Sequence, residues 1–206
     1  MGFEKKSNQN GRTIVELIAY IVVMVAITAS VAQIVAQGLH KYESSAVLQQ
    51  LLDLKKVIAA RYAADGNYQN LSWNDLCADR IGPKSLMPET DASTGRCVSQ
   101  HGRHIFDGIV RIGSADVGKT YYIEFQELPQ DVCVQLGTIV WSNMDGSDLD
   151  RMVIGQGAGL QHSKTWVWQY SPVSEADGDK ELPANIRDVA DSCTSEDDNT
   201  IRWYFN

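Results

Sequence analysis

The chain has 206 residues, of which 44% are hydrophobic and 21% charged, which is enough apolar material for one folded domain with a buried core. Its formal net charge is -8 and it has no run of more than two basic residues. A nucleic-acid-binding surface is therefore excluded as its main function, because phosphate neutralisation requires clustered Lys and Arg. The cysteines, Cys77, Cys97, Cys133 and Cys193, form no C-x-x-C pair, which argues against a zinc site or a thioredoxin-like motif. Their even number suggests two disulfides and an oxidising compartment.

The N-terminal part of the chain contains an apolar run at residues 13–39 with one ionisable side chain, Glu16. As a helix the run would span roughly 40 Å, more than the hydrocarbon core of a bilayer at about 30 Å. It is longer than the apolar region of a cleaved secretory signal, which has about 7 to 15 residues. A signal anchor explains this length, and it explains Lys5, Lys6 and Arg12 as positive flanks on the cytoplasmic side.

Glu16 is the feature that a plain anchor does not explain. A carboxylate costs about 2.5 to 3.5 kcal/mol at the centre of a membrane helix and less near its end, so a tolerated interfacial acid is one interpretation. The other interpretation is a cationic partner. The run contains no Lys or Arg, since the next basic residue is Lys41. The partner must then come from the flank, from a free amine or from another chain.

The sequence around this carboxylate, "GRTIVE" at residues 11–16, resembles the class III signal of type IV pilins. In that signal a short basic leader ends in Gly, and Glu is the fifth residue after it, at the start of a long apolar stretch. The resemblance implies that a prepilin peptidase cuts between Gly11 and Arg12, and that residues 1–11 are a leader. It also implies that Glu16 pairs with the α-amino group of a neighbouring subunit during assembly. Burying the two opposite charges together avoids the cost of burying either of them without a partner. Arg12 departs from the family, whose first mature residue is usually Phe, Met or Leu and is often N-methylated.

Helical periodicity continues beyond the apolar run. Apolar residues follow at spacings of 4, 3, 4 and 4, which places one stripe on a helix face: Val47, Leu51, Leu54, Ile58 and Tyr62. Asp65-Gly66 is a stop signal, since Gly accepts the left-handed conformation of a helix cap. We expect one helix from about Thr13 to Ala64, with residues 12–39 as a transmembrane and filament-core half and residues 40–65 as an amphipathic half.

Residues 66–206 are expected to form a globular part. Its first stretch, residues 66–103, is rich in Gly, Pro, Asn and Asp and resembles the αβ-loop of type IVb, PilS-like pilins. Pattern and turn chemistry then predict, in chain order, strands at 104–113 and 121–128, a helix at 128–144, strands at 149–156 and 164–170, a short helix at 182–193 and a last strand at 199–206. Strands grouped between helices indicate an antiparallel sheet packed on the long helix, an α+β fold.

Four cysteines allow three pairings, and the spacing alone does not choose between them. The Leu-Pro-x-x-x-Cys element ending at Cys133, together with the late Cys193, resembles the two ends of the disulfide-bounded D-region of type IVb pilins. The resemblance implies a D-region at residues 133–193 closed by these two cysteines, which leaves Cys77 to pair with Cys97. A bridge that closes so long a loop is typically worth about 2 to 4 kcal/mol.

No motif indicates catalysis. "GQGAG" (155–159) lacks the Lys-Ser/Thr of a phosphate loop and is interpreted as a flexible surface loop. "NMDGSDLD" (143–150) lacks the spacing of a calcium loop and is interpreted as a solvated turn. In "TWVWQY" (165–170), Trp166 and Trp168 lie on the same face of a predicted strand. This face is interpreted as a core or subunit contact, with an aromatic ligand platform as the alternative. We expect no enzymatic activity, no metal and no cofactor.

Together these features predict a structural subunit of a type IVb pilus. The resemblance implies a precursor anchored in the bacterial inner membrane with a periplasmic globular part, and then an extracellular homopolymer for adhesion, aggregation or conjugative contact. The expected partners are further copies of the chain, prepilin peptidase, the pilus assembly machinery and the inner membrane. The alternatives are a minor pilin or a type II secretion pseudopilin, and a signal-anchored periplasmic binding domain that never polymerises.

Overall fold

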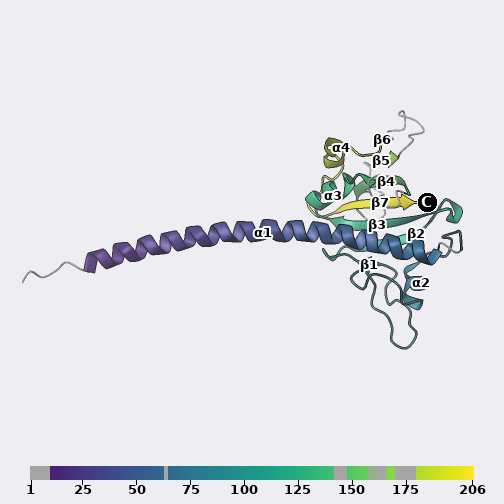
Figure 1. Ribbon diagram of the computed structural model, residues 1–206, viewed down its shortest axis with the longest axis horizontal. Helices are drawn as coiled ribbons and strands as arrows, with labels where there is room; N and C mark the ends of the chain where they lie inside the picture. Colours follow the sequence, from purple (N-terminus) through teal and green to yellow (C-terminus); the bar gives the residue numbers. More distant parts are fainter. Residues whose placement is uncertain (1–9, 63–64, 142–147, 158–159, 161–165, 170–179) are drawn as a thin grey trace, which may run out of the picture. The chain divides into compact units, whose positions relative to one another are not determined.

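The computed structural model describes residues 10–62, 65–141, 148–157, 160, 166–169 and 180–206 (Figure 1). Within these ranges, the structure describes the backbone but not the side chains of residues 10–13, 29, 32–41, 166, 169 and 180. The chain divides into two compact units, Met1–Glu43 and Ser44–Asn206, and the second is called the head below.

One helix, α1 (Asn10–Tyr62), begins in the first unit and ends in the head. It ends as the stop signal predicts, because the backbone N–H groups of Asp65 and Gly66 donate to the Tyr62 carbonyl at 3.1 and 3.2 Å. Gly66 has φ +63°, the left-handed conformation that favours glycine at a helix cap. Over the described residues, no helix is both long enough and apolar enough to cross a membrane. Residues 12–13, 29 and 32–39 of the predicted membrane half lie outside the described side chains.

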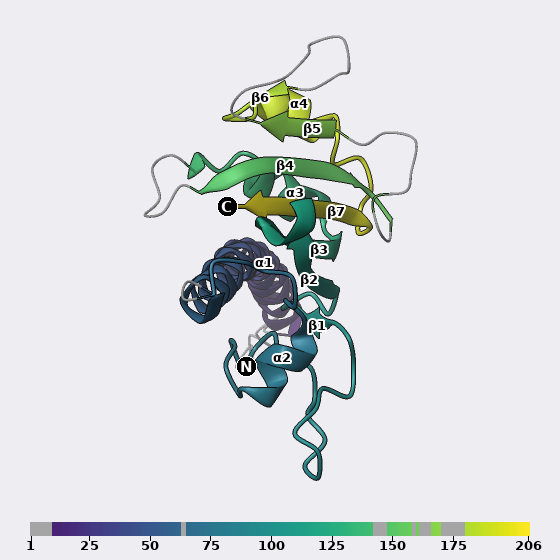
Figure 2. The same cartoon turned by 90° about the vertical axis from the view of Figure 1, so that its right-hand side faces the viewer.

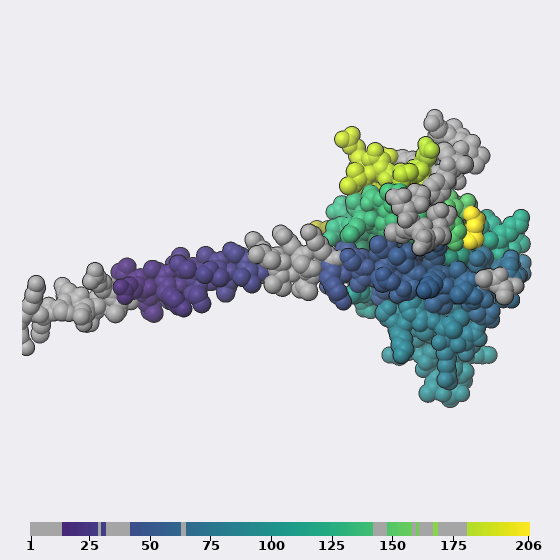
Figure 3. Space-filling view, viewed as in Figure 1, coloured from purple at the N-terminus to yellow at the C-terminus, as the bar shows by residue number. Residues whose placement is uncertain are grey.

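The head is built on the predicted apolar stripe of α1. Its side chains are 0 to 5% exposed and share one core cluster with residues of the sheet: Val47, Leu51, Leu54, Ile58 and Tyr62. Figure 2 looks nearly along α1 and shows it beside β3 (Thr120–Leu128) and β7 (Asn199–Phe205). In Figure 3 the head part of α1 (blue) lies between the green strands and helices and the teal segment that follows it in sequence.

The described strands form one sheet in the order β1-β2-β3-β7-β4-β5-β6. Its other strands are β1 (Gly102–Arg103), β2 (Ile109–Ala115), β4 (Leu149–Gln156), β5 (Trp166–Gln169) and β6 (Lys180–Glu181), and the short helices are α2 (Trp73–Ala78), η1 (Asp116–Gly118), α3 (Gln130–Gly137) and α4 (Ile186–Ala190). All pairs are antiparallel, as predicted, except the edge pair β5–β6, which is parallel. The last strand of the chain, β7, lies between β3 and β4 in the middle of the sheet.

Three predicted elements are longer than the observed ones, and one of them is the helix expected at 182–193, which is observed as Ile186–Ala190. The strand expected from residue 104 begins at Ile109, because residues 104–108 form a tight turn in which the His104 N–H donates to the Gly108 carbonyl at 3.0 Å. The helix expected to reach residue 144 ends at Gly137. A Cβ at Gly137 would lie 2.6 Å from a Val189 methyl carbon, so tight packing against α4 occupies the space that a larger residue would need.

The structure changes two further sequence interpretations and supports a third. Gly155 and Gln156 of the expected "GQGAG" loop belong to β4, and residues 158 and 159 lie outside the described part. In "NMDGSDLD", residues 143–147 are outside the description, but Asp148 is not simply solvated: its carboxylate lies 2.5 Å from the Lys55 ammonium. Trp168 is fully buried in the core, which favours the core interpretation for this residue.

The turn after β1 holds a buried histidine. His104 is 3% exposed, and its ring stacks on Phe125 at 5.5 Å between centroids. Its Nδ1 accepts a hydrogen bond from the Phe106 N–H at 3.3 Å, so Nε2 carries the proton and donates to the Gln126 carbonyl at 2.7 Å. Burial lowers the pKa of His104 below its ordinary value, because desolvation disfavours the charged form.

This burial predicts a pH-dependent stability. A histidine whose folded pKa is lowered stabilises the protein above the unfolded pKa of about 6.5, and that contribution is lost as the pH falls through the folded pKa. We expect the thermal midpoint of the wild type to fall by a few degrees between about pH 7 and pH 5.5, on a scale where 1 kcal/mol is about 2 to 4 °C. His104→Gln should reduce this slope, whereas the control His101→Gln should keep it; equal slopes in both variants would contradict the assignment.

Candidate functional site

The first unit exposes an apolar helix surface. Twelve large apolar side chains between Ile14 and Val31 are 45 to 66% exposed within the single chain, and Glu16 is exposed among them. Monomeric soluble proteins rarely expose a contiguous apolar patch of more than a few hundred Å². A surface of this kind is typical of a segment that lipid or other protein chains cover.

The neutral polar side chains in this surface are satisfied by the helix itself. The Thr28 hydroxyl donates to the Met24 carbonyl at 2.8 Å, and the Ser30 hydroxyl donates to the Ala26 carbonyl at 2.8 Å. Such bonds let hydroxyl groups enter an apolar environment without water. An ionised Glu16 cannot be satisfied in the same way, because a carboxylate only accepts hydrogen bonds and the N–H groups of a helix interior are already bonded.

The predicted processing residues lie in the first turn of the same helix. The backbone of Gly11 and Arg12 is helical from the start of α1 at Asn10, while their side chains and residues 1–9 are outside the description. Arg12 and Glu16 are four residues apart along α1, so their backbone positions lie about one helix turn apart. Of the three predicted N-terminal site residues, Glu16 is the one whose side chain the structure describes.

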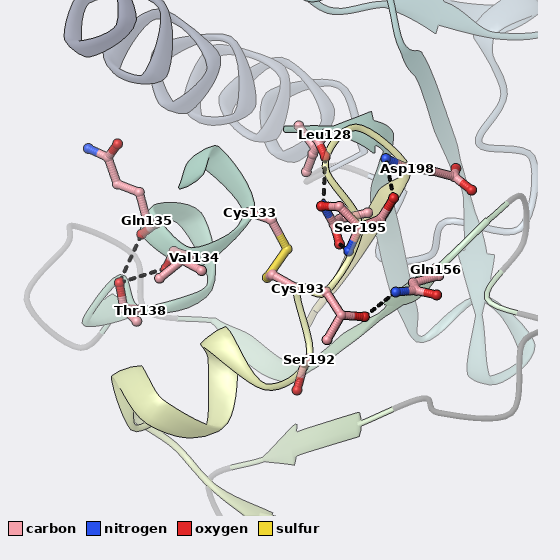
Figure 4. Close-up of a disulfide and its surroundings, with 12 residues drawn as sticks. Leu128, Cys133, Val134, Gln135, Thr138, Gln156, Ser192, Cys193, Ser195 and Asp198 are labelled. Carbon is pink, nitrogen blue, oxygen red and sulfur yellow. Dashed lines mark hydrogen bonds between the residues drawn. A yellow bond between two sulfur atoms is a disulfide. The ribbon is translucent and has the colours of Figure 1, made fainter. Parts of the chain in front are cut away.

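The second predicted group of site residues is the cysteines. Cys133 and Cys193 form a disulfide with a Cα–Cα distance of 5.9 Å, and both are fully buried (Figure 4). The bridge joins α3 to the segment after α4, and the Cys133 and Cys193 N–H groups donate to the carbonyls of Pro129 and Val189, both at 2.9 Å. These are the ends of the D-region that the resemblance implies.

Cys77 and Cys97 form the other disulfide, with a Cα–Cα distance of 5.7 Å. This disulfide lies within the 66–103 segment and joins residues 20 apart, from α2 to the isolated β-bridge between Thr90 and Cys97. The same segment is tied to the sheet by Trp73, whose indole N–H donates to the Val110 carbonyl at 2.9 Å. The segment also contributes apolar side chains to the core cluster, among them Leu71, Trp73, Leu76 and Leu86.

The structure contains a buried ion pair that the sequence analysis missed. Glu124 on β3 is fully buried, and Arg202 on β7 binds it at 2.6 Å between Nε and Oε2. Gln126 donates a further hydrogen bond to Glu124. The sequence did carry a signal for this pair, because Glu124 alternates with Ile123 and Phe125 in a β-rich segment. A charge on a buried strand requires a partner. The pair joins neighbouring strands on the sheet face opposite those two apolar residues.

A family model described as "PilS N terminal" matches residues 40–206. No curated protein sequence matches the chain. A solved type IVb pilin from Salmonella typhi is similar with a TM-score of 0.50 and 15% identity, covering 78% of this chain and 97% of that chain. TcpA, a type IV pilin from the Vibrio cholerae El Tor biotype, has a TM-score of 0.45 and 16% identity. The similarity covers 80% of this chain and 99% of that chain. The first similarity confirms the predicted α+β pilin fold.

The disulfide that closes 60 residues should contribute more stability than the one that closes 20. We expect Cys133→Ser/Cys193→Ser to lower the free energy of unfolding by about 2 to 4 kcal/mol, and Cys77→Ser/Cys97→Ser by about 1 kcal/mol less, because the longer loop removes more entropy from the unfolded chain. Urea unfolding followed by tryptophan fluorescence measures both. The reverse order of the two losses would contradict this explanation.

Proposed function

Because the chain belongs to the PilS N-terminal family of type IVb pilins, we propose that it is the structural subunit of a type IVb pilus and polymerises through the N-terminal part of α1. It is a structural protein and not an enzyme. The observation that carries the proposal is the uncovered apolar surface between Ile14 and Val31. Neighbouring copies of the same helix would cover it in a filament, and the inner membrane would cover it before assembly.

Glu16 has a specific role in this proposal. Once the apolar helices are packed together, its carboxylate loses water and needs a cation, since an unpaired buried charge is strongly destabilising. Cleavage after Gly11 would create an α-amino group at Arg12, and the amino group of a neighbouring subunit would pair with Glu16. Arg12 itself lies one helix turn away and would add a second cation.

The two disulfides support a route through the periplasm, where such bonds persist. The proposed sequence of events is insertion into the bacterial inner membrane with the head in the periplasm, cleavage by prepilin peptidase, and incorporation by the pilus assembly machinery into an extracellular filament. The filament would then serve adhesion, aggregation or conjugative contact.

Processing can be tested on the full chain. Incubation with a prepilin peptidase, followed by N-terminal sequencing, should give a mature chain that begins at Arg12. Gly11→Leu should block cleavage, whereas Gly38→Ala, a glycine later in the same helix, should leave it unchanged. A mature chain with another first residue would exclude this cleavage site.

The role of Glu16 in assembly predicts a separate phenotype. Glu16→Ala should leave processed, membrane-bound subunit at wild-type levels but reduce sheared filaments at least about tenfold, since removing one partner of a buried ion pair costs about 3 to 5 kcal/mol. Glu43→Ala, an acid in the head-proximal part of α1, is the matched control and should assemble normally. Wild-type filament yield from Glu16→Ala would refute the pairing.

A further inference from the structure

The head has an open hollow at the end of β3. It has a volume of about 510 Å³ and combines two apolar residues with three carboxylates: Phe106, Glu127, Pro129, Asp197 and Asp198. All three acids are exposed, and Figure 4 shows the Asp198 side chain pointing away from the neighbouring disulfide. Among the described side chains, no Lys or Arg forms an ion pair with any of them. The hollow therefore offers an apolar floor and uncompensated negative charge.

The opposite end of β3 carries a complementary protrusion. Val117, in the turn between β2 and β3, is 88% exposed, and the exposed Lys119 follows it. Val117 has φ +59°, which is a genuine outlier for a β-branched residue. The turn is held on both sides, because the Tyr68 N–H donates to the Gly118 carbonyl at 2.8 Å and the Thr120 hydroxyl donates to the Asp116 carboxylate at 2.8 Å. An apolar side chain and a cation are thus presented outward on a fixed turn.

Within one head, the Val117 turn cannot contact the hollow. They lie at the two ends of β3, whose nine residues span about 27 Å at roughly 3.3 Å per residue. A protrusion and its complement on opposite ends of one body produce a head-to-tail contact between copies. Such a contact continues as an open helical array when its rotation does not close.

We propose that the Val117 turn of one subunit docks into the hollow of the next subunit in the filament. Val117 packs on Phe106 and Pro129 of the neighbouring copy. Lys119 pairs with the carboxylates of Asp197 and Asp198 of that copy, which fixes the polarity of the contact. The inference rests on the proposed function, because it places this contact within a pilus.

The occupant is assigned to a second copy because both complementary surfaces belong to the same chain. In the described part of the chain, no three His, Cys, Asp or Glu side chains are arranged to hold a metal ion, so the acids of the hollow do not form a cation site of that kind. The Val117 turn presents an apolar side chain beside a cation, and the hollow presents apolar residues beside carboxylates, so the two surfaces are complementary in both respects. A free cation would contact the carboxylates but not the apolar residues.

Cysteine cross-linking tests the contact directly. All four native cysteines are bridged, so Val117→Cys with Asp198→Cys introduces the reactive thiols. Oxidised sheared filaments of this variant should give a ladder of covalent multimers on non-reducing gels. Val98→Cys with Asp198→Cys is the control, because Val98 is 69% exposed but lies in the αβ-loop, and it should give no ladder. Filaments without a ladder above this control would overturn the inference while leaving the proposed function intact.

Charge reversal gives a second, independent test. Lys119→Glu should lower filament yield at least about tenfold, because like charges would then meet across the contact. Adding Asp197→Lys and Asp198→Lys should restore the yield to within about threefold of wild type. Lys84→Glu, on the exposed αβ-loop, should have no effect, and thermal melting checks that each variant is folded.

Each remaining outcome decides one of the two proposals. Wild-type yield from Lys119→Glu, or no restoration by the compensating charges, would overturn the contact even if the double-cysteine variant makes no filaments. A wild-type chain that never forms filaments with its assembly machinery would instead overturn the proposed function, and the contact with it.

Discussion

The head of this protein depends on the contact between one face of α1 and the sheet. Val47, Leu51, Leu54 and Ile58 are fully buried there, and they share a core with the central strands β3 and β7. Burial of each such side chain is worth about 1.5 to 3 kcal/mol, so this stripe contributes much of the apolar driving force of the fold. The same helix continues, in residues 14–31, as an apolar surface that the described chain does not cover. The apolar side chains in one half of the helix are therefore buried when the head folds. Those in the other half need lipid or further copies of the chain to cover them.

Charge follows the same logic in both parts of the chain. Within the head, Glu124 is fully buried and Lys55 is partly buried, and each has a partner, Arg202 and Asp148 respectively. Such pairs are weak sources of stability, but the loss of one partner is strongly destabilising, so they restrict which arrangements of the strands can form. Glu16 would meet the same requirement only once its helix is covered. In the proposed filament, the covering subunit would supply a partner through its α-amino group, and Arg12 of the same helix would add a second cation.

Local sequence signals failed where distant residues decide the structure. The turn at 104–108 interrupts an apparently continuous strand, and the His104 ring in this turn binds the Gln126 carbonyl, 22 residues away. The helix after Pro129 ends at Gly137, where a Cβ would lie 2.6 Å from a methyl carbon of Val189 on α4. Periodicity could not anticipate either effect, since it reports that a face will be buried and does not report what covers it.

Local sequence was sufficient to predict the long helix with its buried stripe, the α+β class, the strands at 149–156 and 199–206, and the family to which the chain belongs. These features follow from local patterns of 3.6- and 2-residue period and from a short motif, which can be recognised without knowing the chain path. The position of the last strand at the centre of the sheet became apparent from the three-dimensional arrangement alone. The same arrangement brings Glu124 to Arg202, 78 residues away, and places the Val117 turn and the acidic hollow at opposite ends of β3. These features depend on how distant segments pair, because side chains far apart along the chain become neighbours only when the sheet forms.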